Sequence, residues 1–158
     1  MLRKPYARRA GFAALLLSAT TAAVAFAAHP VGGAKYKGQT AQKEPLSFKV
    51  NSKATRIVKL NIPDLRYTPP DPCVDPESNP ITSKDIRKIV IRKSGKFGGS
   101  HTKKYPAMNG VPATSVRKSI AGKFVSSKKA KGTARIEQFQ SGHKRCDTGK
   151  VAFTVKRK

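Results

Sequence analysis

Short stretches of alternating apolar and polar residues constrain the fold of this chain more than any other feature. Residues 46–50 read Leu-Ser-Phe-Lys-Val, and residues 58–62 and 151–156 alternate in the same way. A period of two is typical of a strand with one buried and one solvated face. Turn-forming residues such as Asn109-Gly110 and Asp147-Thr148-Gly149 separate these stretches. The pattern predicts an all-β fold, an antiparallel β-sandwich of immunoglobulin-like or jelly-roll-like type.

Further strands are predicted by the same spacing elsewhere in the chain. They contain Ile89 and Ile91, Ile120 and Phe124, and Ala134 and Ile136. The phase of the alternation places the aromatic rings Phe48, Phe124 and Phe153 in the core. One helical alternative is a single turn within residues 82–90, which Ser83 could cap; its β-branched residues keep such a turn local.

Residues 1–27 have the organisation of a secretory signal peptide, predicted as a helix. Basic residues at positions 3, 4, 8 and 9 precede an uncharged stretch, which ends in the small-residue pattern Ala25-Phe26-Ala27. An uncleaved membrane anchor is the alternative, but Ala and Thr dominate the stretch and insert weakly. We therefore expect a secreted protein, free or associated with the cell wall, with no membrane span after cleavage. Residues 28–34 form a flexible lead, and residues 35–158 form one domain.

The chain contains two cysteines, Cys73 and Cys146. Because exported proteins meet an oxidising environment, the sequence predicts a disulfide between them. Closing a loop of about 74 residues would stabilise the fold by roughly 4 kcal/mol in the chain-entropy model. A zinc site built from both cysteines with His101 and His143 is an alternative, although the close ligand spacing of structural zinc sites is missing. Free thiols are the third possibility.

Residues 63–80 contain six of the eleven prolines and are predicted to form a long loop. The same segment contains Asp71, Asp75 and Glu77, which are hard oxygen ligands of the kind that calcium prefers. Turn formation next to proline explains these acidic residues equally well. We therefore predict no metal site and no cofactor, and leave calcium open.

Positive charge is the most unusual property of the composition. The formal net charge is +25, and residues 28–158 retain 29 Lys and Arg against 8 Asp and Glu. Lys outnumbers Arg there by 21 to 8, which suits diffuse attraction to a polyanion better than recognition of specific bases. We expect no specific nucleic-acid partner. The candidate polyanion-binding residues are Arg87, Lys88, Arg92, Lys93, Lys103, Lys104, Arg117, Lys118, Lys128, Lys129, Lys131, Lys144 and Arg145.

No catalytic residues can be assigned from the sequence. A Ser-His-Asp triad requires a histidine held by a carboxylate, but His29 lies in the lead, and His101 and His143 lie in stretches that read as solvated turns. Gly95, Gly98 and Gly99 lack the strand-loop-helix setting of a phosphate-binding loop. We therefore predict that the protein is not an enzyme.

Several motifs together resemble a known but uncharacterised group of proteins. They are Tyr36-Lys37-Gly38-Gln39-Thr40, the stretch 46–50, Gly122-Lys123-Phe124, Gly132-Thr133-Ala134 and the closing stretch 146–153. In these the chain resembles small exported β-sandwich domain proteins of high-GC Gram-positive bacteria. The resemblance implies a fold and an export route, and it brings no catalytic residues.

Three functions remain in view. The first is a secreted, noncatalytic, strongly cationic module, a monomer, that associates by charge with anionic polymers of the cell wall, envelope or matrix. The second is an exported structural or interaction protein whose charge is incidental and whose partner binds through the proline-rich loop of residues 63–80. The third is an extracellular hydrolase.

Overall fold

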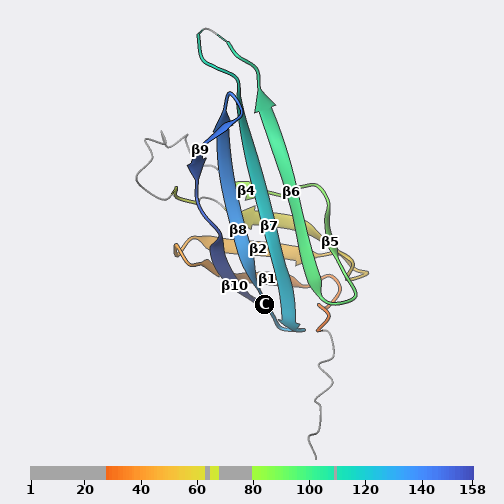
Figure 1. Cartoon of the computed structure of the whole chain (residues 1–158). Coiled ribbons are helices and arrows are strands. Elements are labelled where there is room, and N and C mark those ends of the chain that lie inside the picture. Colours follow the sequence, from red (N-terminus) through yellow and green to blue (C-terminus); the bar gives the residue numbers. More distant parts are fainter. Residues whose placement is uncertain (1–27, 63–64, 68–79, 109) are drawn as a thin grey trace, which may run out of the picture.

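The computed structural model describes residues 28–62, 65–67, 80–108 and 110–158, and these residues form ten strands and no helix (Figure 1). The predicted signal peptide lies outside the described residues. In order, the strands are β1 (Lys35–Thr40), β2 (Pro45–Val50), β3 (Arg56–Ile62), β4 (Ile81–Thr82), β5 (Ile89–Ile91), β6 (Lys96–Tyr105), β7 (Thr114–Ser126), β8 (Lys129–Gln140), β9 (His143–Asp147) and β10 (Val151–Arg157).

Eight of these strands close into an antiparallel barrel. The hydrogen-bonded order is β10-β1-β2-β3-β5-β6-β7-β8, and β10 pairs with β8 to complete the circle. The short strand β4 pairs with β3, and β9 pairs with β8, so both lie outside the circle. The predicted all-β, antiparallel character is confirmed. The predicted β-sandwich is wrong, because the sheet closes on itself.

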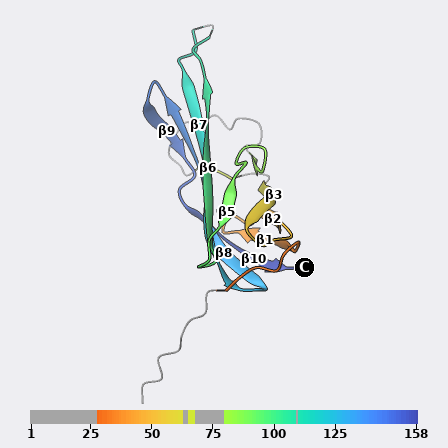
Figure 2. The same ribbon diagram turned by 90° about the vertical axis from the view of Figure 1, so that its right-hand side faces the viewer.

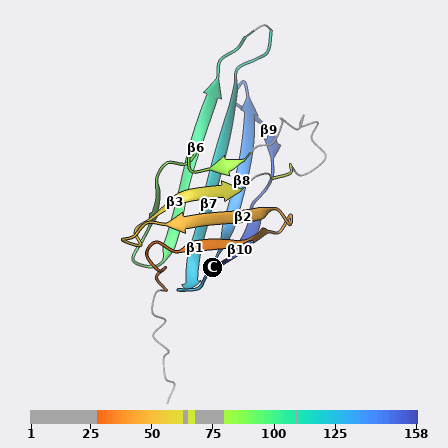
Figure 3. The same cartoon turned by 180° about the vertical axis from the view of Figure 1, so that it is seen from behind.

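The barrel has two layers of strands, as a β-sandwich does. β1, β2 and β3 lie to one side of the long strands β6, β7 and β8 (Figure 2) and cross in front of them at a steep angle in the view from behind (Figure 3). Each strand of a barrel or of a sandwich buries every second residue, so alternation alone does not distinguish the two. The distinction depends on β10, which pairs with β1 on one side and with β8 on the other.

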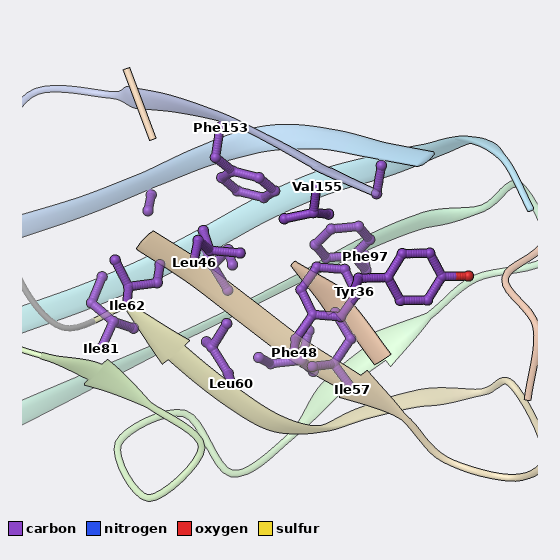
Figure 4. Packing of buried hydrophobic residues seen from close by; sticks show 14 of the residues in the cluster. Tyr36, Leu46, Phe48, Ile57, Leu60, Ile62, Ile81, Phe97, Phe153 and Val155 are labelled. Atoms are coloured by element: carbon purple, nitrogen blue, oxygen red, sulfur yellow. The ribbon is translucent and has the colours of Figure 1, made fainter. Parts of the chain in front are cut away.

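Apolar side chains fill the barrel interior (Figure 4). The predicted core residues Phe48, Phe124 and Phe153 are all buried, and the rings of Phe48 and Phe124 meet edge to face with their centroids 6.1 Å apart. Tyr36 is completely buried beside them, and its hydroxyl donates a hydrogen bond to the carbonyl of Ser127 at 2.8 Å. Because these rings fill the interior, a binding surface has to lie on the outside of the barrel.

A bulge in β3 changes one part of the predicted alternation. Lys49 pairs with Lys59, but the next residue, Val50, pairs with Ile57, so Val58 is the extra residue. Val58 is therefore 44% exposed, whereas Ile57 points into the core. The sequence pattern had placed Val58 inside.

Residues 82–86 form a turn, closed by a hydrogen bond from the amide of Ile86 to the carbonyl of Thr82. The carboxylate of Asp85 caps this turn, since it accepts from both the amide and the hydroxyl of Thr82 at 2.9 and 2.8 Å. The predicted capping residue Ser83 is not the one that the structure uses.

The segment 28–34 lies against the β2–β3 turn. The amide of Gly33 donates to the carbonyl of Asn51, and the amide of Val50 donates to the carbonyl of Ala34. Cys146 on β9 is buried and disulfide-bonded, and no described cysteine is free. Its predicted partner Cys73 lies outside the described residues, as do Asp71, Asp75 and Glu77, so the pairing stays a prediction.

Candidate functional site

Nine lysines on the outer face of the barrel form three rows that run across neighbouring strands. Each row contains three lysines that the strand register places directly opposite one another. We call these the lysine rows: Lys35-Lys49-Lys59 on β1, β2 and β3; Lys37-Lys156-Lys129 on β1, β10 and β8; and Lys96-Lys123-Lys131 on β6, β7 and β8.

The lysine rows concentrate positive charge at a cost to stability. Side chains directly opposite on paired strands have Cβ atoms about 5 Å apart, and like charges at that distance repel. None of the ion pairs among the described residues includes a lysine of these rows. Seven of the nine are exposed, and only Lys49 and Lys129 are half-buried. The rows therefore present uncompensated charge to solvent.

The first row lies in a shallow groove of about 390 Å³ over β1, β2 and β3. Lys35, Lys49 and Lys59 line it together with Lys37, and no carboxylate is among the lining residues. Ser47 and Asn61, which stand opposite each other on β2 and β3, also line the groove and offer hydroxyl and amide donors. Four ammonium groups and two neutral donors suit an anionic, oxygen-rich ligand.

The carboxylates cannot offset this charge. The described residues contain 29 Lys and Arg but only four acidic side chains. Each of the four is already in an ion pair: Glu44 with Arg66, Asp85 with Lys118, and Glu137 and Asp147 with Arg135. Most of the positive charge therefore has no described carboxylate to balance it.

Asp147 is the centre of the largest of these clusters. The guanidinium of Arg135 donates hydrogen bonds to both of its carboxylate oxygens. Lys144 donates from its ammonium at 3.0 Å and Gly149 from its amide at 2.8 Å. The hydrogen bonds from Arg135, then those from Lys144 and Gly149, lower the pKa of Asp147 well below its usual range, against the opposing effect of burial. The carboxylate therefore stays ionised and fastens β9 to β8.

Lys118 has a structural role, although it was predicted to bind a polyanion. Its ammonium donates to the carbonyl of Pro80 at 2.7 Å and lies 3.4 Å from a carboxylate oxygen of Asp85. Partial burial acts to raise the pKa of Asp85, but hydrogen bonds from Thr82 and the charge of Lys118 outweigh it and lower the pKa. Lys118 therefore holds the turn at residues 82–86 against β7.

The structure distributes the other predicted residues over three places. Lys129 and Lys131 belong to the lysine rows, with Lys128 beside them in the β7–β8 turn. A second group surrounds β5: Arg87 and Lys88 precede it, and Arg92 and Lys93 follow it. The third group lies on the part of β6, β7 and β9 beyond the barrel: Lys103, Lys104, Arg117, Lys144 and Arg145.

The candidate residues predicted from the sequence do not include seven members of the lysine rows, namely Lys35, Lys37, Lys49, Lys59, Lys96, Lys123 and Lys156. Their outward phase follows from the alternation, because each stands next to a residue that points inward. Their alignment depends on the strand register, which the alternation does not contain. Most of the predicted residues are instead basic pairs that are adjacent in sequence.

His101 and His143 lie in strands, not in the predicted turns. His101 lies within β6, which continues past the barrel because it remains paired with β7, and His143 begins β9. Both are exposed. Within the part of the chain that the structure describes, no three His, Cys, Asp or Glu side chains gather in a way that could hold a metal ion.

No helix among the described residues is long and apolar enough to cross a membrane. No protein-family model matches the chain, and no curated protein and no solved structure matches it either.

Proposed function

We propose that the protein is a secreted, noncatalytic module that associates by charge with anionic polymers of the cell envelope or matrix. The single observation that carries this proposal is the alignment of nine lysines in three rows. Net charge alone would keep a protein soluble wherever its lysines stood. A scattered arrangement would give the same charge without lysines facing one another across paired strands, so alignment favours a binding role over incidental charge.

The form of the surface also favours an extended ligand. The rows lie on both layers of the barrel, since one crosses β1–β3, another crosses β6–β8 and the third connects the two layers through β10. A long polymer with phosphate, sulfate or carboxylate groups can contact more than one row. Binding would release counterions from the polymer, and its affinity would fall steeply with salt. Lysine suits this diffuse matching of charge.

Salt-dependent retention tests the proposal. The variant Lys35→Gln/Lys49→Gln/Lys59→Gln removes the first row, and Lys53→Gln/Lys84→Gln/Lys150→Gln removes the same charge from three exposed lysines outside the rows. On immobilised heparin and on immobilised long-chain polyphosphate, the row variant should elute at clearly lower salt than the control variant. Each lost contact should reduce the slope of log affinity against log salt by about 0.7–0.9.

Two results would count against the proposal. Equal shifts for the two triple variants would mean that only net charge matters, which is the incidental-charge alternative. Retention that does not change with salt would exclude counterion release altogether.

A further inference from the structure

The hairpin of β6 and β7 continues beyond the barrel as an arm with exposed faces. Pairing runs without interruption from Ser100 opposite Ser119 to Tyr105 opposite Thr114, and every residue of β6 from Ser100 onwards is exposed. The arm projects from the end of the barrel, and its tip is the point farthest from the body of the barrel (Figures 1 and 2). Because its residues are exposed, the arm can contact a partner outside the molecule.

The described residues of the tip, 106–108 and 110–113, are uncharged and exposed. Met108 and Val111 face each other in an isolated bridge, with reciprocal backbone hydrogen bonds of 3.1 and 2.9 Å. Their exposed fractions, 68% and 59%, are the largest of any large hydrophobic side chain in the described chain. Pro106 and Pro112 flank them and restrict the backbone on both sides. The described residues of the tip thus present an exposed apolar surface.

Positive charge surrounds the base of this tip. Lys103 and Lys104 precede it on β6, and Arg117 follows it on β7. Lys144 and Arg145 lie on β9 beside the same arm. Glu137 on β8 and Asp147 on β9 lie beside the arm; Glu137 is paired with Arg135, and Asp147 is paired with both Arg135 and Lys144. None of the ion pairs among the described residues includes Lys103, Lys104 or Arg117, and we call these three residues the collar. The arm therefore combines an apolar end with a collar of cations.

A hollow of about 630 Å³ lies directly below the tip. Its lining includes the rings of Tyr105 and Phe139, with Lys104 and Ser115 among the polar residues. The ammonium of Lys103 lies 4.8 Å from the centre of the Tyr105 ring. Aromatic rings and lysines just below an apolar tip match the boundary between lipid headgroups and acyl chains, where both residue types are favoured.

We propose that the tip of the β6–β7 arm inserts into the surface of an anionic lipid bilayer. Met108 and Val111 would enter the acyl boundary, while the collar contacts the headgroup phosphates. Apolar insertion and attraction to negative lipid act on the same contact, and each alone is weak for so small a tip. This contact is separate from the proposed binding of polymers, which uses the lysine rows on the barrel.

A single tryptophan can report the insertion, because the chain contains none. The Met108→Trp variant places the probe at the tip of the full chain, and the Val58→Trp variant places a control probe at an exposed position on the barrel. With vesicles of phosphatidylglycerol and phosphatidylcholine, the emission of the tip probe should shift to the blue and be quenched by brominated acyl chains. The barrel probe should show neither effect, and vesicles of phosphatidylcholine alone should leave the emission of the tip probe unchanged.

Because the readout belongs to one position, membrane contact by residues 1–27 cannot imitate it. Emission from the tip probe that does not change on anionic vesicles, or that changes equally for the barrel probe, would overturn insertion of the tip. A blue shift of the tip probe with soluble heparin but not with vesicles would also overturn it and assign the tip to the polymer.

Two further measurements separate the parts of the proposal. Adding Lys103→Gln/Lys104→Gln to the Met108→Trp variant should reduce the vesicle-induced shift several-fold, and an undiminished shift would contradict the role of the collar. Retention of the Met108→Trp variant on heparin should match that of the unmodified chain, so loss of one property leaves the other measurable.

Discussion

Gly122 on β7 stands directly opposite Gly132 on β8, and two phenylalanine rings occupy the space that side chains at these positions would need. Cζ of Phe97 is 2.5 Å from the position of a β-carbon at residue 122, and Cζ of Phe153 is 2.6 Å from that at residue 132. Both distances are too short for any real contact. The absence of side chains at this glycine pair therefore leaves room for the rings of Phe97 and Phe153 in the core.

The variant Gly122→Ala should destabilise the barrel by about 1–3 kcal/mol, because the added methyl group overpacks the core against Phe97. Urea denaturation, followed by circular dichroism, would measure the loss. Ala121→Val adds volume to the next residue, which is exposed on the outer face, and should change stability by less than about 0.5 kcal/mol. Equal effects of the two variants would contradict the packing role of the glycine pair.

The buried hydroxyl of Tyr36 supplies a second test of the core. It donates to the carbonyl of Ser127 and accepts from the amide of Val31 at 3.3 Å, so it connects β1 to the β7–β8 turn and to the segment 28–34. Tyr36→Phe should lower the free energy of unfolding by about 1–2 kcal/mol, since both partners lose a bond inside the protein. Tyr105→Phe, at an exposed position on the arm, should have no measurable effect in the same thermal melts.

Alternation was sufficient to predict β2, β3, β5, β7, β8 and β10 and most of the core, but the parts of β6 and β9 that contain His101 and His143 read as turns. Phe48, Phe124 and Phe153 lie inside because a residue's face in a strand depends only on its phase, which a local pattern contains. Barrel closure could not be predicted, because it depends on whether β10 finds a partner on both sides. The bulge at Val58 could not be predicted for a similar reason, since an extra residue can be recognised only from its pairing with the neighbouring strand.

The candidate site shows the same division between local and long-range information. A large excess of positive charge and an outward phase for the lysines on strands follow from the sequence. The opposition of Lys49 to Lys59 does not, because register arises from turns and bulges that act over the whole sheet. Lys118 illustrates the converse: the sequence shows a basic residue, and only the fold brings it to Asp85.

A single charge reversal in the first lysine row should stabilise the protein and weaken polymer binding at the same time. Lys49 faces Lys35 on one side and Lys59 on the other, so Lys49→Glu replaces two repulsions by two attractions. We expect a gain of about 0.5–1 kcal/mol in the free energy of unfolding at low salt, falling as salt screens the pairs. Elution from heparin should move to lower salt.

Lys53→Glu in the β2–β3 turn makes the same change of charge away from the rows. Thermal melts at low and high salt should show little stabilisation for this control. If both variants gain equally, the benefit comes from the lower net charge of the molecule and not from the rows.

The cluster around Asp147 predicts how stability depends on pH. Hydrogen bonds from Arg135 and Lys144 lower the pKa of Asp147 in the folded state, below the value of about 4 that an unfolded chain gives. A group with a depressed folded-state pKa contributes fully above the unfolded pKa and loses its contribution as the pH falls towards the folded pKa. Asp147→Asn should therefore cost about 1–2 kcal/mol at neutral pH.

Below pH of about 4 the unmodified protein and the Asp147→Asn variant should converge in stability, since the unmodified protein alone loses the contribution of the ionised carboxylate. Glu44→Gln is the matched control, because its partner Arg66 is largely exposed and surface pairs of this kind contribute little. Urea titrations at several pH values would measure both variants. A deficit for Asp147→Asn that stays constant down to low pH would mean that the residue acts through its shape and neutral hydrogen bonds, and not through its charge.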